Sequence, residues 1–235
     1  MRPNSPPRLL DDAALERSSV VANNAMNRER GLSGVNSYTR ELGFDPAELL
    51  ATRLRADPAR PVTWIDVCCG SGRALLDAET RLTREFPDAD LALVGIDLVG
   101  YFAAAPRTDR LRLITGSVTR WRAPRPADVV TCVHGLHYIG DKLGLLAAMA
   151  GWTAADGVLA ADFDAAEIRR ADGGPAAAEV VAALRAAGLG YDARRHRVRG
   201  DGPRVPAVPA TYLGADAAAG PGYTGQPSVA SYYAW

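Results

Sequence analysis

The chain has 235 residues, and its 27 basic residues balance its 27 acidic residues. This balance excludes the strongly basic surface of a dedicated nucleic-acid or anionic-membrane binder. With 48% hydrophobic residues the chain can bury a sizeable core. No apolar run reaches the ~18 residues that span a bilayer, and the first residues lack the apolar centre of a secretory signal. We therefore expect a soluble cytoplasmic protein with no membrane or nucleic-acid partner.

Residues 1–60 are expected to form a helical N-terminal cap or lid. A weak helical pattern covers residues 13–26, and glycines punctuate a loop at 30–38. Asp45 and Pro46 then mark a helix start, because Asp is a good N-cap and Pro suits the first helical position.

From residue 62 onward, short apolar strands alternate with helices. Strands are expected at 62–68, 91–96, 111–115, 128–133 and 157–161, and helices at 73–86, 142–149 and 175–187. Strands that are apolar on both faces indicate a parallel sheet covered by helices on both sides. The sequence therefore predicts an α/β fold whose doubly wound, mostly parallel sheet lies within residues 61–215.

The end of the chain changes character. Residues 191–199, followed by a glycine-rich turn at 200–202, predict a strand rich in arginine, and 210–213 predict a returning antiparallel edge strand. The arginines either keep a solvent-exposed sheet edge from pairing with another strand or bind an acidic group of a substrate. Residues 216–235 form a Gly/Pro-spaced tail that is too aromatic for a disordered segment, so we expect it to pack on the domain.

The most informative stretch runs from Asp66 to Gly72 and joins a predicted strand to a predicted helix. Gly70 and Gly72 let the backbone approach a ligand, and the helix start offers free N–H groups. The carboxylate of Asp66 suits a ligand ammonium group and would repel a pyrophosphate. Asp97 ends the next strand, close to the ~20-residue spacing at which an acid binds ribose hydroxyls. The ligand is therefore expected to be a nucleoside.

These motifs resemble the class I S-adenosylmethionine (SAM)-dependent methyltransferases of the small-molecule type. The family's loop reads roughly Asp-x-Gly-x-Gly-x-Gly, and here Cys68 stands at the first glycine. The resemblance covers residues 62–163 and implies a seven-stranded Rossmann-like sheet. It also implies SAM as cofactor and S-adenosylhomocysteine as product. No metal is expected, although the scattered carboxylates leave a divalent-metal site open.

The resemblance also implies which residues contact the cofactor. Asp97 and Leu98 correspond to the ribose-binding strand end, and Ser117 with Val118 to the segment that binds adenine. Tyr38 belongs to a segment that folds over the methionine end. The full set of expected cofactor contacts is Tyr38, Asp66, Cys68, Gly70, Gly72, Asp97, Leu98, Ser117, Val118 and His134.

Two histidines follow the fourth strand and are the catalytic candidates. Imidazole titrates near neutrality, so His134 or His137 could deprotonate a hydroxyl, an amine or an activated carbon. Alternatively, His137 packs against the next helix while His134 touches the cofactor. Cys68, Cys69 and Cys132 are expected to be small core residues and not nucleophiles.

The sequence thus predicts methyl transfer from SAM to an O, N or C nucleophile of a small molecule, for which a secondary metabolite is one candidate. The alternative is a SAM-binding enzyme that performs cyclisation or elimination. An NAD-dependent oxidoreductase would need a glycine or alanine where Leu75 stands. A non-catalytic SAM-binding protein would not depend on His134 and His137. The aromatic tail could wall the substrate pocket or form the seam of a homodimer.

Overall fold

The computed structural model describes residues 8–22, 29–206 and 208–235. Residues 1–7 and 23–28 of the predicted N-terminal cap lie outside the described residues, and so does the end of the helix expected at 13–26. Within the described part of the chain, every helix is too short or too polar to cross a membrane.

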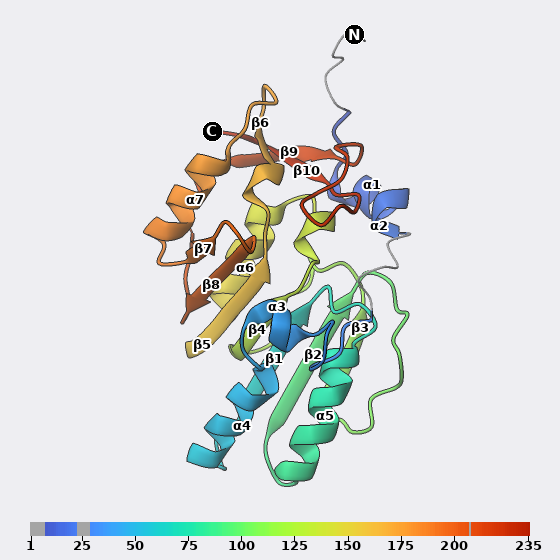
Figure 1. The fold of residues 1–235 in the computed structure, drawn as a ribbon, viewed down its shortest axis with the longest axis vertical. Coiled ribbons are helices and arrows are strands. Elements are labelled where there is room, and N and C mark those ends of the chain that lie inside the picture. The colour runs from blue at the N-terminus through green and yellow to red at the C-terminus, as the bar shows by residue number, and fades with distance from the viewer. Residues whose placement is uncertain (1–7, 23–28, 207) are drawn as a thin grey trace.

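The centre of the molecule is a seven-stranded sheet with the strand order β3-β2-β1-β4-β5-β8-β7 (Figure 1). Five strands pair in parallel: β1 (Val62–Val67), β2 (Leu91–Asp97), β3 (Leu111–Thr115), β4 (Ala127–Cys132) and β5 (Thr153–Asp162). At one edge, β8 (Arg197–Asp201) runs antiparallel to β5, and β7 (Gly190–Asp192) pairs antiparallel with β8. The strand order changes direction between β1 and β4. The predicted doubly wound, Rossmann-like sheet with an antiparallel edge is confirmed.

Helices cover both faces of this sheet. On one face, α4 (Pro46–Ala56) and α5 (Arg73–Glu85) bury leucines against β1 and β2. On the other face, α6 (Lys142–Trp152) buries leucines against β4 and β5, and α7 (Ala177–Ala186) packs against β7. The start of α4 follows the prediction, because the Asp45 carboxylate accepts hydrogen bonds from the N–H groups of Ala47 and Glu48. Two cores, one on each face, therefore fix the sheet.

A second, three-stranded sheet lies above the main sheet in Figure 1, next to the N-terminal helices. Its strands are β6 (Ile168–Arg170), β10 (Ala230–Ala234) and β9 (Thr211–Asp216). The short helices are α1 (Asp12–Glu16), α2 (Ser19–Ala22), α3 (Tyr38–Leu42), η1 (Leu136–Tyr138) and η2 (Ala165–Glu167). Leu10 bridges to Ala215 of β9, so the start of the chain is attached to this second sheet. The aromatic tail contributes its central strand, β10.

Two C-terminal expectations were wrong. Residues 200–201 belong to β8, and the chain turns earlier, at 193–196, where the Asp192 carboxylate accepts hydrogen bonds from the N–H groups of Arg194 and Arg195. The strand expected at 210–213 does not return to the main sheet but forms β9 of the second sheet. The reason is packing, since Tyr212 of β9 contacts Tyr233 of β10.

Candidate functional site

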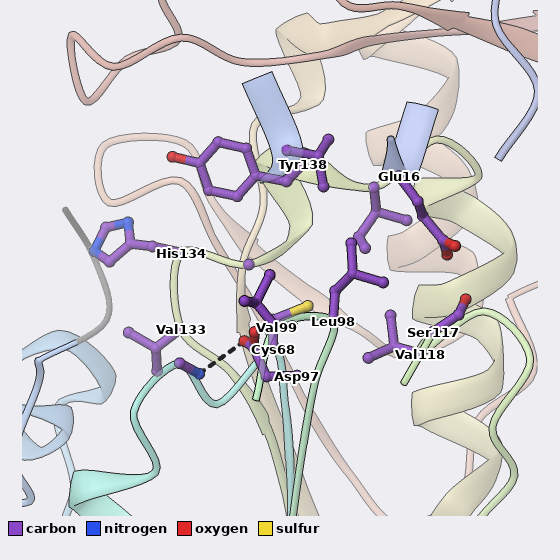
Figure 2. A pocket seen from close by; sticks show the side chains of 14 residues that line it. Glu16, Cys68, Asp97, Leu98, Val99, Ser117, Val118, Val133, His134 and Tyr138 are labelled. Atoms are coloured by element: carbon purple, nitrogen blue, oxygen red, sulfur yellow. Dashed lines mark hydrogen bonds between the residues drawn. The ribbon is translucent and has the colours of Figure 1, made fainter. Parts of the chain in front are cut away.

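A pocket opens where β1, β2 and β4 end (Figure 2). This is the point at which the strand order changes direction, and doubly wound sheets bind ligands there. The pocket holds about 690 Å³, counting the part open to solvent. Glu16 of α1 and Val21 of α2 also line it.

Seven of the ten predicted cofactor residues line this pocket. They are Cys68, Gly70, Asp97, Leu98, Ser117, Val118 and His134. They come from four separate segments of the chain, and the topology of the sheet brings them together.

Asp97 is held in a fixed orientation at the base of the pocket. Its Oδ2 accepts a hydrogen bond from the Gly70 N–H at 2.9 Å, drawn as a dashed line in Figure 2. Its Oδ1 accepts a hydrogen bond from the Val99 N–H at 3.0 Å. Backbone donors on both oxygens fix the plane of the carboxylate, which is the group suited to accept hydrogen bonds from vicinal hydroxyls.

The glycine loop follows a path that L-residues rarely adopt. Gly70 and Gly72 have φ angles of 59° and 70°, and Cys68 has a φ of 57° without being a glycine. Cys68 is half-buried, and its interaction with Cys132, together with burial, raises the pKa of its thiol well above the usual value. Cys68 therefore stays a thiol at neutral pH.

An apolar slot adjoins Asp97. Leu98 and Val99 stand beside the carboxylate, and Val118 faces them across the pocket (Figure 2). Ser117 ends the slot, and its hydroxyl is hydrogen-bonded to the Thr119 hydroxyl at 2.9 Å. An acid next to an apolar slot with a polar end suits a sugar attached to a flat heterocycle.

The three remaining predicted residues, Tyr38, Asp66 and Gly72, are not among those that line the pocket. The Tyr38 hydroxyl donates to Asp66 Oδ2 at 2.7 Å, and the Thr131 hydroxyl donates to Asp66 Oδ1 at 2.6 Å. Burial raises the pKa of Asp66 to about 7. Gly72 packs so closely on Leu113 that an added Cβ would lie 2.9 Å from a methyl carbon of that leucine. Cofactor contacts by Tyr38, Asp66 and Gly72 stay predictions.

All three histidines of the sequence surround Tyr223, which belongs to the loop between β9 and β10. The ring centroids of His134, His137 and His196 lie 6.3, 5.0 and 4.0 Å from that of Tyr223. The sequence singled out His134 and His137 and left open whether the tail walls the substrate pocket, but it did not place His196 there.

Each of these histidines also faces at least one carboxylate. His137 Nδ1 is 2.9 Å from Glu167 Oε1, and His196 Nδ1 is 3.3 Å from Asp164 Oδ1. Burial by itself would raise the pKa of Glu167, but the hydrogen bond with His137 and the charge of Lys142 hold it below the usual value. Glu167 is therefore an ionised partner that orients the His137 ring.

His134 occupies the side of the pocket opposite Ser117 and Val118 (Figure 2). The backbone N–H of His134 donates to Asp162 Oδ2 at 3.1 Å. Its Nε2 is 3.5 Å from Glu41 Oε2 and 3.7 Å from Asp162 Oδ2. Sequence reasoning missed both acids. Asp162 ends β5 just as Asp97 ends β2, so the same strand-end rule could have found it, whereas Glu41 carries no comparable signal.

Strand order, glycine loop and strand-end acid together define a Rossmann-like α/β protein with a pocket at its topological switch point. Among solved structures, the chain is similar to SAM-dependent methyltransferases. The match to a SAM-bound amino pentose methyltransferase from Micromonospora echinaspora has 29% identity, covers 50% of this chain and 49% of that chain, and has a TM-score of 0.37. A sugar N-methyltransferase from a Streptoalloteichus species matches at 26% identity over 53% and 51% of the two chains, with a TM-score of 0.34.

A SAM-dependent methyltransferase from Thiobacillus denitrificans, in complex with S-adenosylhomocysteine, matches at 22% identity over 48% of this chain and 47% of that chain, with a TM-score of 0.35. The chain thus spans about half the length of the solved structures it matches. No protein-family model and no curated protein matches the chain.

Proposed function

We propose that this chain is a SAM-dependent methyltransferase that methylates a small molecule. The observation that carries the proposal is the Asp97 carboxylate, fixed by the N–H groups of Gly70 and Val99 beside an apolar slot. In this proposal Asp97 accepts hydrogen bonds from the two ribose hydroxyls. Leu98 and Val118 enclose the adenine, and Ser117 meets its polar edge.

The remainder of the cofactor is assigned to the loop end of the pocket. Cys68 and Gly70 face the methionine part, and His134 borders it on the side towards Tyr223. SAM supplies a methyl group that is already activated on a sulfonium. The chain therefore contributes mainly alignment of the acceptor and exclusion of water.

We propose His137 as the general base for an acceptor that arrives protonated. Glu167 binds its Nδ1, and its Nε2 is buried without a hydrogen-bond partner among the described residues. A neutral imidazole held in one tautomer by a carboxylate can accept a proton at the other nitrogen. His134 is then left to contact the cofactor.

A small acceptor fits the charge of the chain and of the site. The formal net charge is zero, which gives no electrostatic attraction for a nucleic acid. The groups around Tyr223 are imidazoles and the carboxylates of Asp162, Asp164 and Glu167. Such groups bind the hydroxyl and amino groups of a small polar molecule.

Calorimetric titration with SAM, S-adenosylhomocysteine and NADH tests the cofactor. We expect both sulfur nucleosides to bind the wild type, and Asp97→Ala to weaken binding by ~10–100-fold, because hydrogen bonds to a charged group contribute ~1.5–3 kcal/mol. Asp90→Ala is the matched control, since Asp90 is an exposed acid at the opposite end of the same strand. Binding of NADH in place of SAM would overturn the proposal.

A second assay tests the reaction. The protein is incubated with SAM and panels of hydroxyl- and amine-bearing small molecules, and mass spectrometry follows S-adenosylhomocysteine and the gain of one methyl group. His137→Asn should lower kcat by ~10²–10⁴-fold with little change in SAM affinity, which is the range for removing a general base. SAM consumption without S-adenosylhomocysteine would indicate cyclisation or elimination instead.

A further inference from the structure

Three groups from distant parts of the chain converge beside the pocket. Glu41 belongs to α3, His134 follows β4, and Asp162 ends β5. One nitrogen or oxygen atom of each lies within 4.8 Å of the others. The three atoms are His134 Nε2, Glu41 Oε2 and Asp162 Oδ2, so a nitrogen and two carboxylate oxygens face one small space.

The nitrogen in this cluster makes no hydrogen bond of normal length to any described residue. The His134 side chain is only 7% exposed, and its Nε2 is buried without a hydrogen-bond partner among the described residues. Its distances to the two oxygens, 3.5 and 3.7 Å, exceed those of a normal hydrogen bond. A single N–H could also point at only one of the two oxygens. A buried polar atom in this state needs a further partner.

We propose that Glu41, His134 and Asp162 bind a first-row divalent cation of the Zn²⁺ or Mn²⁺ kind. Such ions hold imidazole nitrogen and carboxylate oxygen at about 2.0–2.2 Å. Ligands at that distance from one centre lie ~3.0–3.5 Å from one another in octahedral or tetrahedral arrangements. The observed 3.5 and 3.7 Å are close to this separation. The imidazole favours Zn²⁺ over Mg²⁺ and Ca²⁺, which prefer oxygen ligands, and the two carboxylates suit Mn²⁺.

The charges around the cluster are consistent with a divalent ion of moderate affinity. Two carboxylates balance the two positive charges of the ion. Arg30 forms an ion pair with Glu41 through the other carboxylate oxygen, at 2.8 Å. Arg197 also acts on both Glu41 and Asp162. These guanidinium groups reduce the negative charge of the cluster, so we expect weaker binding than in a structural zinc site.

The position of the cluster gives the ion a role that rests on the proposed function. Three protein ligands leave coordination positions for an added oxygen, as in catalytic metal sites. His134 borders the cofactor pocket, and Tyr223 lies on its other side. A coordinated acceptor hydroxyl would lose its proton more easily. In the transfer, that proton goes to His137, the oxygen–methyl bond forms as the methyl–sulfur bond breaks, and the sulfur keeps the electron pair.

Metal titration of tag-free, chelator-treated protein tests the site. ZnCl₂ is followed by calorimetry, and MnCl₂ by the loss of the free Mn²⁺ signal in electron paramagnetic resonance. We expect one ion to bind the wild type and Glu41→Gln to weaken binding at least tenfold. Glu48→Gln, a change at a half-buried acid on the neighbouring helix, should bind as the wild type does. Absence of binding, or equal binding by wild type and Glu41→Gln, would overturn the inference.

Imidazole NMR gives a second readout that does not depend on any variant. The sequence has only three histidines, so their ring signals are few. Zn²⁺ should shift or broaden the His134 signals first. A His134 ring that carries protons on both nitrogens at neutral pH and ignores Zn²⁺ would show a simple ion pair instead. Metal binding without SAM binding would overturn the proposed function alone, and SAM binding without metal binding would overturn this inference alone.

Discussion

Tyr223 stacks on His196, with ring centroids 4.0 Å apart and 10° between the ring planes. The stack joins the loop between β9 and β10 to the turn that precedes β8. Tyr223 also brings its hydroxyl to 3.4 Å from His134 Nδ1. Burial and the nearby carboxylates raise the pKa of Tyr223, so its hydroxyl stays protonated at neutral pH. This one side chain therefore covers the proposed acceptor side of the pocket.

Two substitutions of Tyr223 should distinguish the effect of its ring, which stacks on His196, from the effect of its hydroxyl group. Tyr223→Phe keeps the ring and should leave the His196 imidazole signals in NMR nearly unchanged. Tyr223→Ala removes the ring, so these signals should lose their ring-current shift, and the unfolding free energy should fall by about 1–2 kcal/mol. If Tyr223→Ala leaves the His196 signals where they are, the stack does not form in solution.

Cys68 should tolerate glycine better than valine. A non-glycine residue in the left-handed region costs about 1–2 kcal/mol, and Cys68 lies there with a φ of 57°. Cys68→Gly removes this strain but loses the packing of the thiol, so urea unfolding should change by less than about 1 kcal/mol. Cys68→Val adds a β-branched side chain to the strained backbone and should lose more than about 2 kcal/mol. Equal stability of the two variants would refute the strain argument.

The parallel half of the fold could be predicted because local signals there agree with the tertiary structure. The strand expected at 111–115 is β3, and the helix expected from Arg73 is α5. Both have clear periodicity and turn residues at their ends. The β7–β8 hairpin has neither, because its residues are mostly charged and its register is set by pairing with β5. In such segments, tertiary contacts determine the secondary structure.

The site was predictable only where it follows the sheet topology. Asp97 and Ser117 each come directly after or soon after a strand, and parallel strands deliver their carboxyl ends to one edge. The meeting of Glu41 with His134 depends on how α3 folds back over that edge. No residue spacing encodes this contact. The hydrogen bond from the Tyr38 hydroxyl to Asp66 likewise joins two distant segments and has no signal in the sequence.

Asp66 should make the protein less stable as the pH rises. Its pKa is raised from 3.8 to about 7 in the folded state, so the folded state binds this proton more tightly than the unfolded state does. Stability from this group is therefore highest below pH 4, falls between pH 4 and pH 7, and is level above pH 7. The contribution at pH 8 should be about 3 kcal/mol lower than at pH 5.

Asp66→Asn isolates this effect, because the amide cannot ionise and keeps one oxygen to accept a hydrogen bond. Urea unfolding of the wild type and of Asp66→Asn at pH 5 and pH 8 gives the difference attributable to the carboxylate. Asp90→Asn, at an exposed acid, is the control and should follow the wild type. Parallel pH profiles for the wild type and Asp66→Asn would show that Asp66 titrates at an ordinary pKa.

Lys142 is the only lysine of the sequence, and it is completely buried. Its ammonium group donates to the carbonyl oxygens of Ile139 at 3.0 Å and Val229 at 2.6 Å, and to the Ser231 hydroxyl at 3.2 Å. Glu167 Oε2 lies 3.5 Å away. Burial lowers the pKa of Lys142, although the charge of Glu167 opposes this. The lysine thus attaches the C-terminal segment to α6.

Lys142→Met should lower the unfolding free energy by about 3–5 kcal/mol, because it leaves buried acceptors and a carboxylate without their partner. Glu167→Gln removes the other charge. The double variant should lose at least about 1 kcal/mol less than the sum of the two single losses, as expected for charges in contact. Arg185→Met, at an exposed position of α7, should change stability by less than about 0.5 kcal/mol. Additive effects of Lys142→Met and Glu167→Gln would mean that the pair does not interact, and that the carbonyl contacts alone hold the segment.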